Sequence, residues 1–160
     1  MSDRPLLRAR QTHERPHVLV VSDDGSLVDF LSEGLPLGGF WVSVIASGLQ
    51  ALEVFRLRRF DIVLVDAGLQ SFNAVELVRR LRGKSTRTTD HEPRTTAPLV
   101  MVTQSNAPFT DDERADLQVV EVLQAPLELD EVARRLHAVF AVWRQANPDV
   151  PLADAANLSR

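Results

Sequence analysis

The chain has 160 residues, a formal net charge of −4 and a pI of about 5.5. Its length suits one domain. Its acidic balance argues against a free-standing nucleic-acid binder, because contacts with phosphates need a net basic surface. The absence of cysteine excludes disulfides, thiolate nucleophiles and cysteine-based zinc sites. No apolar run approaches the roughly 18 residues that a membrane-spanning helix needs, so we expect a soluble, cytoplasmic protein.

The first half of the chain alternates strand and helix patterns. Residues 1–16 are rich in arginine and lack a periodic apolar pattern, so we expect a flexible N-terminal tail. An uninterrupted apolar run at 17–21 is typical of a strand buried on both faces, and a helical pattern follows at 27–35. Aromatic and β-branched residues at 40–45 predict a second strand, and Ser47 is expected to cap the helix that follows it.

The alternation continues in the second half. An apolar run at 61–65 leads directly into Asp66, and a helix is expected over about 73–82. Residues 83–97 hold no hydrophobic side chain larger than alanine, which predicts a long inserted loop that is either functional or mobile. The last predicted elements are a strand at 99–102, a helix opened by the capping box Thr110-Asp-Asp-Glu113, a strand at 119–123 and a helix capped by Asp130. We expect residues 17–146 to form the domain and 147–160 to form a flexible C-terminal tail.

Strict alternation of strands and helices, with short and doubly apolar strands, predicts an α/β fold: a parallel sheet with helices on both faces. Functional side chains of such a fold gather where the carboxyl ends of the strands meet. Asp23 and Asp66 follow two of these ends, and together they make a hard oxygen site suited to Mg²⁺. A carboxylate facing a metal can accept a phosphoryl group, and the Thr103 hydroxyl would then bond a phosphoryl oxygen on Asp66. Taken singly, each aspartate has a simpler explanation as a turn or helix cap.

Several of these segments resemble response-regulator receiver domains. They are Val18-Leu-Val-Val-Ser-Asp-Asp24, Ser47-Gly-Leu-Gln-Ala-Leu-Glu53, Phe60-Asp-Ile-Val-Leu-Val-Asp66, Leu99-Val-Met-Val-Thr103 and Val122-Leu-Gln-Ala-Pro126. The resemblance implies a flavodoxin-like, doubly wound (βα)5 fold with strand order 2-1-3-4-5. It also implies a signalling protein of a two-component phosphorelay rather than an enzyme, with phosphate supplied by a histidine kinase.

The resemblance assigns roles to four positions of this sequence. Asp66 matches the phospho-acceptor, and Thr103 matches the switch hydroxyl. Asp23, Asp66 and the backbone carbonyl of Gly68 match the groups that hold Mg²⁺. No other cofactor is implied.

The sequence also departs from the family pattern. Ser22 stands where the first acid is usual, Ala125 where a lysine is usual, and Val122 where an aromatic switch residue is usual. Gln70 replaces a proline and Ala74 a glycine in the segment after the acceptor. We therefore expect a weakened Mg²⁺ site and slow or poorly coupled phosphorylation of Asp66. Loss of the lysine alone removes a charge-assisted bond of about 1.5–3 kcal/mol.

The single lysine of the chain, Lys84, lies in the 83–97 loop together with Arg87 and Arg94. These side chains could replace the missing cation only if the loop folded over the acidic rim. The loop begins at the opposite edge of the predicted sheet, which argues against that replacement.

Three functions remain open from the residues. The first is a degenerate pseudo-receiver that acts by protein–protein interaction. The second is a single-domain response regulator phosphorylated on Asp66. The third is an aspartate-nucleophile phosphohydrolase, which is disfavoured because Gly68 occupies the place of its second acid. No output-domain pattern follows Trp143, so we expect a histidine kinase or another signalling protein as partner, and neither nucleic acid nor membrane.

A homodimer is a further possibility, through the face built by the last two helices and the last strand. The charged residues expected on that face are Asp111, Asp112, Glu113, Arg114, Arg134 and Arg135. The mixture of acidic and basic groups would suit a symmetric pair.

Overall fold

The computed structural model describes residues 14–88, 91–106 and 108–154. Five parallel strands form one sheet in the order β2-β1-β3-β4-β5, which confirms the predicted flavodoxin-like fold. The strands are β1 (His17–Val21), β2 (Trp41–Ile45), β3 (Ile62–Asp66), β4 (Leu99–Thr103) and β5 (Val119–Gln124). In the described residues, no helix combines the length and apolar character that crossing a membrane requires.

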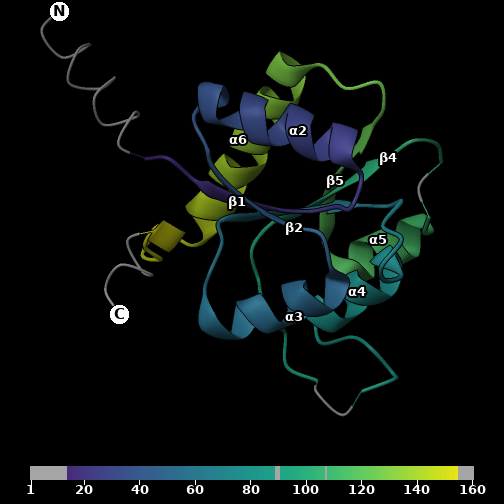
Figure 1. Cartoon of the computed structure of the whole chain (residues 1–160). Helices are drawn as coiled ribbons and strands as arrows, with labels where there is room; N and C mark the ends of the chain where they lie inside the picture. The colour runs from purple at the N-terminus through teal and green to yellow at the C-terminus, as the bar shows by residue number, and fades with distance from the viewer. Residues whose placement is uncertain (1–13, 89–90, 107, 155–160) are drawn as a thin grey trace, which may run out of the picture.

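Helices cover both faces of the sheet (Figure 1). One face carries α2 (Gly25–Gly34), the short 3-10 turn η1 (Leu35–Gly38) and α6 (Leu129–Ala146); the other carries α3 (Gly48–Leu57), α4 (Ala74–Leu81) and α5 (Asp111–Leu117). Because strand side chains alternate between the faces, Leu19 of β1 joins the α3–α5 core and Val20 joins the α2–α6 core. Each strand is thereby fixed in register, and the rim residues are fixed with it.

Two of the three predicted helix caps are confirmed. The Ser47 side chain accepts a bond from Gln50 N, and Thr110 and Glu113 form the reciprocal capping box. The prediction for Asp130 is wrong: α6 begins at Leu129, so Asp130 lies inside the helix, and the N-cap residue Glu128 makes no side-chain cap bond. Leu129 packs so closely on Gly34 that a Cβ at residue 34 would lie 2.4 Å from Leu129 Cδ1, so the start of α6 lies against the end of α2.

The inserted loop is anchored at the amino-terminal edge of the sheet. Gly83 ends α4 with φ of +69°, and a Cβ there would lie 2.6 Å from the His91 carbonyl oxygen. The amides of Arg94 and Thr95 then donate to Leu81 O at 2.8 and 3.3 Å. The loop therefore folds back onto the end of α4 and does not extend toward the acidic rim.

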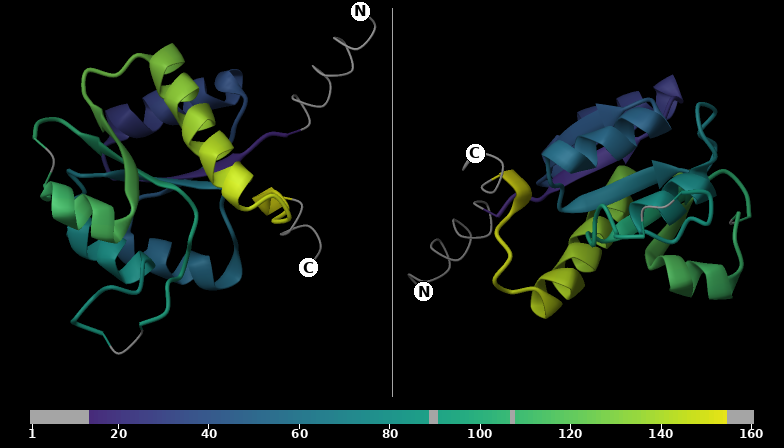
Figure 2. Two further views of the ribbon diagram at one scale, coloured as in Figure 1. Left: turned by 180° about the vertical axis from the view of Figure 1, so that it is seen from behind. Right: turned by 90° about the horizontal axis from the view of Figure 1, so that it is seen from below.

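Residues 147–154 pack onto the domain, which differs from the expected free tail (Figure 2). Ala153 is fully buried, and its amide donates to Asp61 Oδ1 at 2.9 Å. Leu152 packs against the α2–α6 core. A buried carboxylate such as that of Asp61 needs hydrogen-bond donors, and the Ala153 amide supplies one. The sequence of this segment has no apolar periodicity that would have predicted its packing. Of the tail expected at 1–16, residues 1–13 lie outside the described ranges, and Arg15 donates to the carbonyls of Pro36 and Phe40.

Candidate functional site

Ser22 and Asp66 face each other at the carboxyl ends of β1 and β3. Val21 and Val65 are register partners, so the next residue of each strand is brought alongside the other. Ser22 Oγ donates to Asp66 Oδ2 at 2.7 Å, and both side chains are buried. In the sequence Ser22 is recognisable only as the loss of an acid, and its bond to Asp66 was not predicted. The predicted strand order, which makes β1 and β3 neighbours, was a signal that could have revealed it.

The second oxygen of Asp66 is held by the loop that follows it. Gly68 N donates to Asp66 Oδ1 at 2.8 Å. Each carboxylate oxygen therefore accepts from one neutral donor. Within residues 14–88, 91–106 and 108–154, no arginine or lysine forms an ion pair with Asp66.

Asp23 lies at the same rim and ties β1 to the β3–α4 loop. Its Oδ2 accepts from Gln70 N at 2.9 Å and from Ser71 N at 3.0 Å. Asp24, the next residue, caps α2 by accepting from the amides of Ser26 and Leu27. Of the two adjacent acids, Asp23 alone is bonded to the loop that carries Gly68.

Thr103 is buried at the end of β4, but its hydroxyl is engaged within its own loop. Thr103 Oγ1 lies 3.2 Å from Ser105 O and 3.3 Å from Asn106 O, either of which can accept its proton, and it accepts from Ser105 N at 3.2 Å. The expected approach of this hydroxyl to Asp66 is not made here. A bond to a phosphoryl group on Asp66 would require rotation of the Thr103 side chain away from this turn.

Ala125 is brought to the rim by a backbone bond from its amide to Thr103 O at 2.9 Å. Its methyl group offers no hydrogen-bond donor where the family resemblance places a lysine. Val122 packs partly buried against the α3–α5 core, so an aliphatic side chain fills the place of the aromatic switch.

The loop cations do not fill the gap. Lys84 Nζ lies 3.4 Å from Asp116 Oδ1 on α5, and Arg94 donates to Leu52 O on α3 at 2.7 Å. Arg82, just before the loop, is buried, and its guanidinium donates to the carbonyls of Leu117, Thr95 and Gln118 at 3.0 Å each. Burial lowers the pKa of Arg82 to about 10. These contacts hold the basic residues away from Asp66.

The oxygen groups at the rim match Mg²⁺ in kind but are few. Asp23, Asp66 and the Gly68 carbonyl are hard ligands, with water left to complete the shell. All three already interact with protein donors, since Gln70 Nε2 donates to Gly68 O at 3.2 Å. The described part of the chain contains no group of three or more His, Cys, Asp or Glu residues placed to hold a metal ion. The oxygen ligands therefore suit Mg²⁺ chemically. The site has two carboxylates, because Ser22 stands where the family resemblance places a third.

The response regulator receiver domain model matches residues 18–137 of the chain. The DNA-binding response regulator MtrA of Mycobacterium tuberculosis is 42% identical over 71 residues, which cover 44% of this chain and 31% of MtrA. The transcriptional regulatory protein CseB of Streptomyces coelicolor is 40% identical over 73 residues, covering 46% of this chain and 31% of CseB. The chain thus spans about a third of the length of these curated relatives.

Solved structures show the same fold. The Francisella response regulator 1452 receiver domain has a TM-score of 0.66 at 19% identity, covering 79% of this chain and 98% of its own. The receiver domain of the sensor histidine kinase PA1611 from Pseudomonas aeruginosa, solved with a magnesium ion in its active-site cleft, has a TM-score of 0.64 at 19% identity with the same coverage. With the family match over most of the sheet and the acidic rim at the strand ends, the chain belongs to the response regulator receiver domain family of two-component signalling.

Proposed function

We propose that this chain is a degenerate receiver, or pseudo-receiver, that signals by binding another protein and does not depend on phosphorylation of Asp66. The observation that carries the proposal is the electrostatics of the rim. The Asp66 carboxylate is held by Ser22 and Gly68, both neutral donors, while Ala125 presents a methyl group. A phosphoryl group on Asp66 would bring more negative charge to a rim that already carries Asp23.

Phosphoryl transfer depends on positioning and on compensation of the developing charge. A charge-assisted hydrogen bond is worth about 1.5–3 kcal/mol, and a neutral one about 0.5–1.5 kcal/mol. Ala125 removes one such charge-assisted bond. The Ser22 hydroxyl also bonds to the charged Asp66 carboxylate, but it brings no positive charge that could offset a phosphoryl group. With Val122 in the core and Thr103 bonded to its own loop, the rim also lacks parts that would report phosphorylation to a partner.

Mg²⁺ binding is proposed as weak. Asp23, Asp66 and Gly68 O would hold the ion, which supplies positive charge beside the phospho-accepting carboxylate when bound. The magnesium in the PA1611 receiver domain supports a metal at this place in the fold. Ser22 lowers the ligand charge by one, because a hydroxyl replaces a carboxylate.

The proposed partner surface runs along α6 and the edge strand β5, where a groove of about 870 Å³ opens. Val120 and Val142 in its lining are 46% and 70% exposed. Trp143 also lines the groove, and its indole N–H donates to Thr96 O at 3.1 Å. An apolar strip with a polar border suits a protein partner, either a signalling protein or a second copy of this chain.

Three of the six charged residues expected on this face, Glu113, Arg134 and Arg135, form ion pairs within the chain. Arg135 binds Glu121 at 2.7 Å and Glu131 at 2.8 Å, and Glu131 also binds Arg134 at 2.6 Å. Glu113 pairs with Arg79 of α4 at 2.5 Å. Because these three charges already have partners, the exposed valines of the groove are available for apolar contact with a partner. We therefore propose a cytoplasmic signalling protein that binds its partner through the α6–β5 groove and carries out no turnover at the Asp66 rim.

The proposal is tested by phosphorylation of the full chain. The protein is incubated with Mg²⁺ and acetyl phosphate, and phosphoryl adducts are followed by intact mass spectrometry alongside Asp66→Asn. We expect no adduct that depends on Asp66 at millimolar donor. A stoichiometric adduct that disappears in Asp66→Asn would instead establish the phospho-accepting alternative.

A further inference from the structure

A serine, a histidine and an aspartate are joined by hydrogen bonds at the rim opposite Asp66. His17 Nε2 lies 2.7 Å from Ser43 Oγ, and His17 Nδ1 lies 2.5 Å from Asp154 Oδ1. The three residues come from β1, β2 and the packed C-terminal segment. The histidine side chain is only 8% exposed, whereas that of Asp154 is 35% exposed.

The chain holds this histidine in place from several sides. The ring of Phe60 meets the imidazole edge-on, with centroids 5.2 Å apart. Asp61 accepts from His17 N at 2.8 Å through one oxygen and from Ala153 N at 2.9 Å through the other. The Asp61 carboxylate therefore fixes the backbone of the histidine and of the residue before Asp154. Asp61 acts as a positioning residue for the pair.

The connectivity is that of an activated serine nucleophile. A serine hydroxyl contacts one nitrogen of an imidazole, and a carboxylate orients the other nitrogen. With Asp154 accepting from Nδ1–H, Nε2 is left as the acceptor of the Ser43 proton. From this geometry we propose that Ser43 is a nucleophile toward activated carboxylic esters, with His17 as general base and Asp154 as its orienting group.

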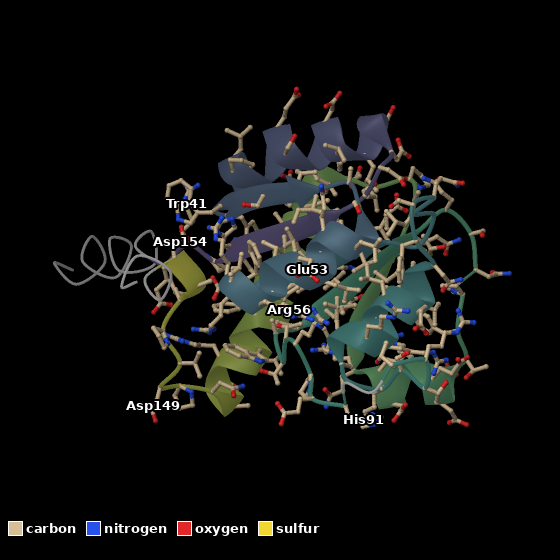
Figure 3. The ribbon with its side chains drawn as sticks, turned by 60° about the horizontal axis from the view of Figure 1, so that its bottom comes forward. Trp41, Glu53, Arg56, His91, Asp149 and Asp154 are labelled. Carbon is tan, nitrogen blue, oxygen red and sulfur yellow. The ribbon has the colours of Figure 1, made fainter. Side chains whose placement is uncertain are left out.

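The edge of the sheet supplies a donor next to this serine. Trp41 N donates to Pro16 O, and Ile45 O accepts from Ser22 N, so the odd-numbered residues of β2 bond toward β1. β2 has no strand on its other side, so the Val44 amide points to the open edge. This N–H directly follows Ser43 and can donate to the oxyanion of a tetrahedral intermediate. Figure 3 shows Asp154 and Trp41 at this same end of the molecule.

The proposed reaction needs no group beyond the ester and water. Ser43 Oγ forms a bond to the acyl carbon while its proton passes to His17 Nε2. The C–O bond of the ester breaks, and the leaving alcohol takes that proton. Water then attacks the acyl-serine by the reverse route and releases the carboxylic acid. This site lies at the amino ends of the strands and is independent of the Asp66 rim, so it stands or falls apart from the proposed signalling function.

The test uses the full chain and a fluorophosphonate probe. Ser43 Oγ bonds to phosphorus, fluoride leaves with the electron pair of the P–F bond, and the serine proton passes to His17 Nε2. Intact mass and peptide mapping should show one adduct, on Ser43. Ser43→Ala should give none, whereas Ser32→Ala, which removes a helical serine bonded only to Asp29 O, should label at the unaltered rate.

Asp154→Asn tests whether Ser43 reacts because His17 and Asp154 activate it or only because it is accessible to the probe. The amide keeps the size of the side chain but no longer favours the Nδ1–H tautomer, so the labelling rate should fall at least about tenfold. Circular dichroism checks that each variant is folded. Absence of any Ser43 adduct in the unaltered chain, or an equal labelling rate in folded Asp154→Asn, would overturn the proposal and leave the three residues as a purely structural link.

Discussion

The hydroxyl of Ser22 donates to Asp66 Oδ2 at 2.7 Å, so an uncharged donor joins the ends of β1 and β3. Ser22 also accepts from Asp24 N at 3.1 Å, so its hydroxyl is fixed on both sides. The serine thus has two effects. It partly satisfies the buried Asp66 carboxylate, and it leaves the rim without a third carboxylate that would attract a metal ion.

Ser22→Asp should therefore increase Mg²⁺ affinity. A third carboxylate at the rim adds a full negative charge within a few ångströms of the ion, which should tighten binding about tenfold or more. Calorimetric titration of the full chain measures the change. Ser32→Asp adds the same charge on α2 outside the donor set, and equal affinities for the two variants would contradict the role given to Ser22.

Arg82→Ala should destabilise the domain strongly. The substitution leaves three carbonyl acceptors without their buried donor and loosens the inserted loop from α5. A cost of about 2–4 kcal/mol is expected in urea denaturation. Arg134→Ala, which removes an exposed guanidinium paired within its own helix, should cost under about 1 kcal/mol.

Asp61 should make the free energy of unfolding fall as the pH rises through the acidic range. Burial is the largest influence on this carboxyl and raises its pKa, while its bonds from His17 N and Ala153 N act the other way. Between the ordinary and the raised pKa the folded state holds more protons than the unfolded state, so the free energy of unfolding falls as pH rises. Above the raised pKa this contribution is constant.

Urea denaturation of the unaltered chain and of Asp61→Ala across the acidic range measures that slope. The stability difference between the two should be largest at low pH and should decline to a plateau as pH rises. Asp149→Ala, at an exposed position, controls for the general loss of negative charge. A difference that instead grew with pH would be inconsistent with a raised pKa at Asp61.

Val142→Glu should weaken association through the α6–β5 groove. The valine is 70% exposed there, and a charge at the centre of an apolar contact commonly costs more than about 1 kcal/mol, or roughly fivefold or more in affinity. Light scattering after size exclusion measures the mass against 17.8 kDa for one chain. Leu49→Glu on α3 alters a similarly exposed residue on the other face of the sheet. If self-association were lost in that variant alone, the interface would lie on the α3 face and not in the α6–β5 groove.

The fold was predictable because it depends on period and composition. Continuous apolar runs predicted β1, β3 and β4, and aromatic and β-branched residues predicted β2. The ends of β1 and β3 placed Asp23 and Asp66 at one rim. Details that depend on contacts between distant segments were not predictable. The Ser22–Asp66 bond required the register of two strands, and the packing of residues 147–154 required the buried Asp61 as a partner. The Thr103 hydroxyl is oriented by bonds within its own turn. No sequence pattern showed whether it would point into that turn or toward Asp66.

The charge at Asp66 decides whether the rim can hold a phosphoryl group, and beryllofluoride, which forms a phosphoryl-like adduct on a carboxylate, measures this. Amide resonances of Gly68 and Thr103 are followed in the full chain while Mg²⁺ and beryllofluoride are titrated. We expect no saturable shift in the unaltered chain and a saturable shift in Ala125→Lys, where a cation is restored beside Thr103. Saturation in the unaltered chain that is abolished by Asp66→Asn would contradict this expectation.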